Sequence, residues 1–180
     1  AGKWEHALRV LHAAAEHLEA LQAVRLHEDC KEHIAYIHLA RGELASANSE
    51  LASVRESARA RGDIAMRHRA EIGLAHIALL EGRVEDASDL AGRTSANGLI
   101  ALVRLRSGNR LGALYAAVNA LGPSPRTGNT ARGRAFHELF GGAWTLLQLL
   151  QDALSRADAR ERNSILSVTE RAKRRLTYIV

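Results

Sequence analysis

The sequence predicts an all-α fold, an array of antiparallel helix pairs with about eight helices, on three observations. The pattern aliphatic-Ala-x-aliphatic-x-Leu-x-x-Gly-x-x-x-x-Ala occurs at Ile34 to Ala47, at Leu74 to Ala87 and at Ile100 to Ala113, and more weakly from Arg134 to Gly142. Only 2 of the 180 residues are proline, while Ala, Leu, Glu and Arg dominate, which favours helices. The chain is 47% hydrophobic but 4% aromatic, so its helices must pack through small residues. Such helix pairs cannot bury their apolar faces alone and are expected to stack.

Each helix is predicted from apolar residues at helical spacing and from the glycine or proline that follows it. The expected helices are 4–21, 28–41, 44–59, 64–81, 84–92, 95–105, 111–121, 131–155 and 158–177. Thr94-Ser95 is expected to cap the helix that ends at Leu105. Gly141-Gly142 either divides 131–155 into two helices or kinks a single one. The segment 122–129, GPSPRTGN, is the one clear loop.

These helices are expected to form one domain made of successive repeats. Its parts are an N-terminal helix at 1–27, repeats at 28–62, 63–93 and 94–125, a degenerate fourth repeat at 130–157 and a capping helix at 158–180. The N-terminal helix carries no copy of the pattern. It therefore either caps the array or is the second helix of a further repeat.

The pattern resembles the tetratricopeptide repeat, in which small residues face one another across a helix pair with a Gly-containing turn. Ala101, Gly108, Ala113, Ala120 and Pro125 match the signature of that family, and the other two copies match its centre. The aromatic-and-Leu-Gly opening of the family is absent, and the turn glycines of the copies are 40, 26 and 34 residues apart, against 34 in the family. The resemblance covers about residues 28–150 and implies a right-handed superhelix.

A narrower resemblance concerns the phrases HLARGELASA and LLEGRVEDA. They look like the helical-repeat domain of large ATP-binding LuxR-family bacterial regulators. That resemblance implies a cytoplasmic sensor or interaction module used in transcription regulation, with DNA binding placed elsewhere in the full regulator.

The family resemblance also implies a binding groove, because the first helix of each pair lines the concave face there. The groove residues expected on this basis are Asp29, His33, Tyr36, Arg69, His76, Arg106, Arg132 and Phe136. Such a groove is acidic at one end and basic and aromatic at the other, which suits an extended peptide or a protein helix. The alternative is that Tyr36 and Phe136 belong to the core and that the arginines belong to an ordinary solvated surface.

No motif for chemistry is present in the chain. Nine histidines and Cys30 include pairs at helical spacing, but no CxxC, HExxH or HxH occurs, and a zinc site needs three or four converging ligands. No GxSxG, phosphate-binding loop or GxGxxG occurs either. We therefore expect no catalytic residues, no metal and no cofactor. A single cysteine also excludes an intramolecular disulfide and suits a reducing cytoplasm.

The formal net charge is +5, but acidic and basic residues interleave, as in RESARARGD, which is typical of a solvated surface. We therefore expect a protein or peptide partner and not nucleic acid. A nucleic-acid-contacting domain is kept as an alternative because the last helix carries Arg171, Lys173, Arg174 and Arg175. A homodimer through the terminal helices is a further alternative. No stretch reaches the roughly 18 apolar residues of a membrane span, so no membrane partner is expected.

Overall fold

The computed structural model of the chain describes residues 2–121, 131–156 and 159–176, without the side chains of 131–140, 154, 161, 168–169 and 171–176. Within these residues the chain forms nine α-helices and no strand, which confirms the all-α class. The helices are α1 Gly2–Ala20, α2 Val24–Ala40, α3 Leu44–Ala60, α4 Ile64–Leu80, α5 Val84–Gly92, α6 Asn97–Arg106, α7 Arg110–Ala120, α8 Ala131–Ser155 and α9 Ala159–Leu176. None of these helices is both long and apolar enough to cross a lipid bilayer.

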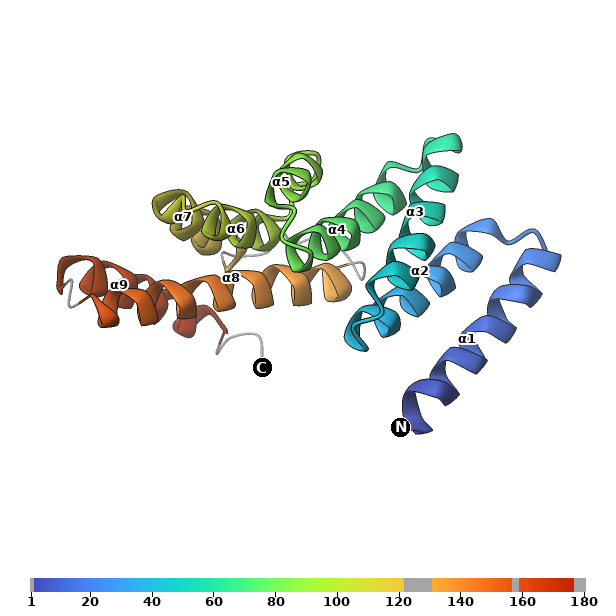
Figure 1. The fold of residues 1–180 in the computed structure, drawn as a ribbon, viewed down its shortest axis with the longest axis horizontal. Coiled ribbons are helices and arrows are strands. Elements are labelled where there is room, and N and C mark those ends of the chain that lie inside the picture. The colour runs from blue at the N-terminus through green and yellow to red at the C-terminus, as the bar shows by residue number, and fades with distance from the viewer. Residues whose placement is uncertain (1, 122–130, 157–158, 177–180) are drawn as a thin grey trace. The chain divides into compact units, whose positions relative to one another are not determined.

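The chain divides into two compact units, Ala1–Arg83 and Val84–Val180. In the first unit α1 packs on α2, α2 on α3 and α3 on α4, and each helix runs back alongside the one before it (Figure 1). In the second unit α6 packs on α5, α7 and α8, and α9 packs mainly on α8. Neighbouring helices thus pack consecutively, as a helical array predicts. The boundary between the units falls at the turn after α4.

Five turns between helices share one backbone conformation, in which the middle residue is left-handed. Four of these residues are glycines, Gly42, Gly62, Gly82 and Gly108, with φ between 70° and 80°. The fifth is Gln22, with φ of 54°. Glycine reaches this region without the steric cost that a Cβ atom brings. Because the first four turns are spaced by 20 residues, the first unit repeats a single helix of 17 residues and a turn of three.

The turn at Gly42 shows how each helix ends and the next begins. The Gly42 N–H donates to the Leu39 carbonyl at 3.0 Å, and the Glu43 N–H donates to the His38 carbonyl at 2.9 Å. This pair of bonds is a Schellman motif, and it satisfies carbonyls that the end of a helix leaves without partners. The next helix starts immediately at Leu44. The short turn therefore makes consecutive helices antiparallel neighbours.

Three expectations about helix boundaries need correction. Helix α2 begins at Val24 and not at 28, because the turn starts the helix although Ala23 provides no side-chain cap. Helix α6 begins at Asn97, and Thr94 does not cap it: its hydroxyl donates to the Ala91 carbonyl at 3.1 Å and so ties back to α5. Helix α8 is a single helix that continues through Gly141-Gly142. The described helices number nine, against about eight expected.

The core of the first unit is built around α3, which lies between α2 and α4. Ala47, Leu51, Val54 and Ala58 of α3 are all at most 1% exposed. A Cβ atom at Gly73 of α4 would lie only 2.6 Å from the Leu51 side chain. Small residues thus allow the close helix approach that the low aromatic content predicts.

The core of the second unit depends on the glycine pair in α8. A Cβ atom at Gly141 would lie 2.5 Å from the Gly98 carbonyl oxygen of α6, and one at Gly142 would lie 3.1 Å from the Ala117 carbonyl oxygen of α7. The glycines are therefore the positions at which α8 passes closest to α6 and α7. This contact explains why two helix-weakening residues stand in the middle of a 25-residue helix.

Candidate functional site

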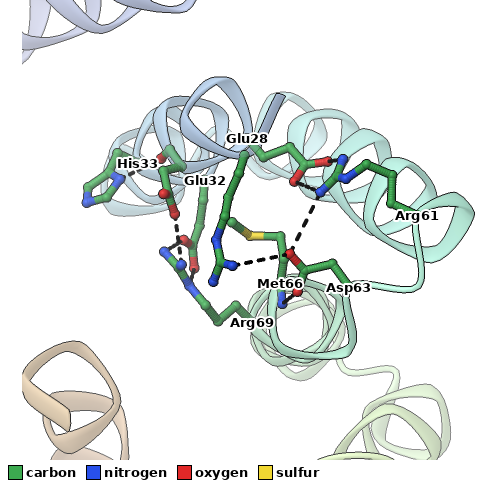
Figure 2. A network of polar contacts seen from close by, with 9 residues as sticks. Glu28, Glu32, His33, Arg61, Asp63, Met66 and Arg69 are labelled. Atoms are coloured by element: carbon green, nitrogen blue, oxygen red, sulfur yellow. Dashed lines mark hydrogen bonds and ion pairs between the residues drawn. The ribbon is translucent and has the colours of Figure 1, made fainter. Parts of the chain in front are cut away.

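A network of polar contacts joins α2, α4 and the end of α3 in the first unit (Figure 2). Two glutamates of α2 are its buried members: Glu28 is 2% exposed and Glu32 is 4% exposed. They stand four residues apart and so share one face of the helix. Burying a carboxylate is costly unless it is paired and hydrogen-bonded, so the partners of these two groups define the site.

Glu28 pairs with Arg61, the residue that follows α3. The Arg61 Nη1 donates to Glu28 Oε1 at 2.5 Å and Nη2 donates to Oε2 at 2.6 Å, so both carboxylate oxygens are bound. Burial by itself raises the pKa of Glu28, but the hydrogen bonds from Arg61 and Ser57 outweigh it and the pKa is lowered. The pair therefore joins the start of α2 to the end of α3 as two charged groups.

Glu32 and Asp29 share Arg69 of α4. The Arg69 Nη1 donates to Asp29 Oδ1 at 2.8 Å, while Nε and Nη2 donate to the two Glu32 oxygens. Burial raises the pKa of Glu32, and the attraction of Arg69 offsets only part of that effect. Burial also lowers the pKa of Arg69, but Glu32 and Asp29 outweigh it, so its pKa is raised and the guanidinium stays charged. This cluster connects α2 directly to α4.

A smaller set of contacts completes the network at the start of α4. Asp63 accepts a hydrogen bond from the Met66 N–H at 3.0 Å, which caps the helix. The Asp63 carboxylate also lies 3.9 Å from Arg25 and 3.8 Å from Arg61. The cap bond is the main reason that the pKa of Asp63 is lowered. One carboxylate thus serves both the fold of α4 and the network.

Of the residues predicted from sequence for the groove, those in the first unit lie on or beside this network. Asp29 and Arg69 bind each other, so each is already occupied by a partner within the chain. His33 is exposed, with its Nδ1 2.6 Å from the Asp29 carbonyl oxygen. Tyr36 is largely buried and lies close enough to Glu32 and Arg69 for their charges to act on it, and burial raises its pKa. His76 is part-buried on α4.

The remaining predicted residues belong to the second unit. Arg106 is exposed at the end of α6 and makes no ion pair among the described residues. Arg132 and Phe136 have side chains outside the described part of the chain. The expected gradient along a groove, acidic at one end and basic at the other, is replaced in the first unit by acids and bases in direct contact.

The sequence reading did not identify Glu28 and Arg61 as a pair. They lie 33 residues apart, and Arg69 lies 37 residues from Glu32. The detectable signal was the spacing: two glutamates four apart in one helix, and arginines displaced from them by little less than one helix pair. The 20-residue period of the turns is needed to see that these positions face one another.

The described residues offer no arrangement for covalent or metal chemistry. No group of three or more His, Cys, Asp and Glu among them is placed to hold a metal ion. Burial raises the pKa of the Cys30 thiol, and Asp29 raises it further, which disfavours the reactive thiolate. A surface hollow of about 470 Å³ lies at the turn between α1 and α2, lined by Glu19, Gln22, Val24 and His27. Its lining contains no pair of converging catalytic groups.

No protein-family model matches the chain, and no curated protein or solved structure matches it significantly.

Proposed function

We propose that the chain is a non-catalytic scaffold of tetratricopeptide-like repeats that binds a protein or peptide, as the sensor or interaction module of a bacterial transcriptional regulator in the cytoplasm. One observation carries the binding part of this proposal. Asp29 and Arg69 occupy equivalent positions in α2 and α4, 40 residues apart, and their side chains are 2.8 Å apart. Equivalent positions of two successive first helices therefore lie side by side.

This alignment produces a strip of side chains that differ between the copies. Tyr36 of α2 and His76 of α4 are also 40 residues apart and lie two turns along from Asp29 and Arg69. His33 is exposed on the same helix as Tyr36, and Leu80, at the end of α4, is exposed. The repeated glycine and alanine positions shape turns and packing, whereas these positions vary, as in scaffolds whose partner is read by the variable residues.

The charges of the strip are neutralised within the chain, so the partner must be recognised in another way. Aromatic, imidazole and aliphatic groups on neighbouring helices suit an extended peptide or an amphipathic helix with apolar anchors. Because Asp29 and Arg69 hold each other, we expect their role to be positioning of the strip and not contact with the partner.

The test is selection of peptides from a random displayed library against the intact chain, followed by affinity measurement with a labelled selected peptide. His33→Glu on α2 and Leu80→Glu on α4 should each lower the affinity about fivefold or more, the effect of losing a contact that matters for binding. Asn48→Glu, an equally exposed change on α3, is the matched control and should leave the affinity unchanged. Equal losses in all three variants, or a library without enrichment, would refute the assignment of the strip.

A second candidate function is favoured by the distribution of charge. Residues 84–180 contain 14 of the 25 Lys and Arg but only 8 of the 20 Asp and Glu, whereas residues 1–83 are nearly balanced. A basic second unit could contact the phosphates of a nucleic acid. Retention on heparin that weakens steeply with added salt is the expected result for this function, and passage through the column at low salt would exclude it.

A further inference from the structure

Helix α1 occupies the place of a second helix in the array. Its residues align with those of α3 at an offset of 40 residues, twice the spacing of the turns. The aligned pairs are Ala7 with Ala47, Leu11 with Leu51, Ala14 with Val54 and Leu18 with Ala58. In chain order α1 is followed by α2 as α3 is followed by α4, and both pairs are packed together. The first helix therefore repeats the packing positions of α3.

The two helices differ in how much of that surface is covered. Helix α3 contacts α2 on one side and α4 on the other, so its four aligned residues are at most 1% exposed. Helix α1 contacts α2 alone within its unit, and its four aligned residues are only part-buried. Val10, which lies five residues before the buried Ala15 and so on nearly the opposite side of the helix, is 54% exposed. Leu21, at the end of that side, is 75% exposed.

On α3 the equivalent side is the one that meets α2, and its contacts are charged. The Lys31 Nζ lies 3.3 Å from Glu50 and donates to the Ser53 hydroxyl at 2.9 Å. Arg61 at the end of that side binds Glu28. The packing of α2 on α3 therefore uses Glu28 and Lys31 as the polar members of its contact face.

The corresponding positions of α1 are apolar. Val10 stands where α3 has Glu50, Ala13 where it has Ser53, and Leu21 where the turn after α3 has Arg61. A helix identical to α2 would bring a carboxylate and an ammonium group against Val10 and Leu21 with no partner for either. Burying a charge without a partner is strongly unfavourable. The complementary helix must be apolar at those two positions.

We propose that α1 is a docking surface for an amphipathic helix of a partner protein, which packs on Ala7, Val10, Ala14 and Leu21 as α2 packs on α3. That helix keeps the aliphatic and alanine positions of Ile34 and Ala35 but carries apolar side chains in place of Glu28 and Lys31. The surface lies on α1 and is independent of the strip on α2 and α4, so either proposal can fail alone.

The probe is a pair of labelled synthetic peptides with the sequence Val24–Ala40, both with Cys30→Ser, titrated with the intact chain and followed by fluorescence anisotropy. One peptide is otherwise native, and the other carries Glu28→Leu and Lys31→Leu. The apolar peptide should bind at least about tenfold more tightly, because only the native peptide must bury charges without partners. Equal affinities, or no binding of the apolar peptide up to its solubility limit, would overturn the proposal.

A variant of the chain reverses the chemistry of the surface. Val10→Glu with Leu21→Arg gives α1 the charges that α3 uses, and both original side chains are more than half exposed, so folding should be retained. The preference should then shift toward the native peptide, whose Lys31 and Glu28 gain partners. An unchanged preference would contradict the assigned contacts. Sedimentation of the unmodified chain provides the other decisive outcome: a dimer that this variant abolishes would show that a second copy, and not a partner helix, covers α1.

Discussion

Replacement of Gly141 by alanine should destabilise the second unit, although alanine is the better helix former. At an open position in the middle of a helix the change would stabilise by about 1 kcal/mol. At Gly141 the added Cβ atom would lie 2.5 Å from the Gly98 carbonyl oxygen, so α6 and α8 would have to separate by roughly 0.5–1 Å. A gap of that size removes a quarter to a half of each contact along the interface, and overpacking typically costs about 1–3 kcal/mol. We expect a net loss of about 2 kcal/mol.

The assay must report on the second unit alone, and the two tryptophans of the chain make this possible. Trp4 lies in α1 of the first unit and Trp144 in α8 of the second. In a Trp4→Phe background, urea unfolding followed by fluorescence reports on the surroundings of Trp144. At a slope of about 1–3 kcal/mol per molar urea, the expected loss lowers the midpoint by roughly 1 M.

Gly92→Ala is the matched control, because nothing lies within 4 Å of a Cβ atom built there. It should change the free energy of unfolding by no more than about 0.5 kcal/mol. A Gly141→Ala variant as stable as the parent, or more stable, would refute the close approach of α6 and α8 and with it the reason for the glycine pair.

Three further predictions concern the first unit. Gln22→Gly should raise stability by about 0.5–1 kcal/mol, because left-handed strain of about 1–2 kcal/mol is removed and part of the gain is offset by unfolded-state entropy; thermal unfolding should show a higher midpoint, and Gly42→Ala a lower one. Arg61→Ala should cost about 2 kcal/mol in urea unfolding, below the usual 3–5 for a buried pair because the Arg61 side chain is 32% exposed, and a cost near zero would deny that Glu28 needs its partner. The lowered pKa of Glu28 contributes stability that is present above its ordinary value of 4.5 and is lost as the pH falls through the folded-state pKa. Melting across this acid range should therefore be less pH-dependent in Glu28→Gln, and an unchanged slope would contradict the assignment.

The turns and most of the helices could be predicted because a single residue type determines each. A glycine such as Gly42 after an apolar stripe indicates a helix end from sequence alone. The same rule failed at Gln22, where the turn has the same conformation without glycine, and so the start of α2 was placed four residues late. The 20-residue period was hidden for the same reason, since its first member lacks the marker residue.

The candidate site was less predictable because it depends on which helices become neighbours. Asp29 and Arg69 were both selected as groove residues, but their mutual bond follows from the alignment of α2 with α4 and not from any local spacing. Glu28 is a polar residue in a helix whose sequence gives no sign that this face is buried. Gly141-Gly142 left two interpretations open, and only the approach of α8 to Gly98 decides between them.

The buried charged pairs have a role that the small-residue interfaces cannot fulfil. Ala47 and its counterparts pack closely against any neighbouring helix with a similar face, so by themselves they do not specify which helices pair or in which register. Glu28 with Arg61, and Glu32 with Arg69, are satisfied only when α2 meets both the end of α3 and the middle of α4. A shift of α4 by one turn would leave Glu32 buried without a partner, at a cost of several kcal/mol. The pairs therefore add little net stability relative to apolar residues, but they exclude the alternative registers that a repeated alanine surface would otherwise allow.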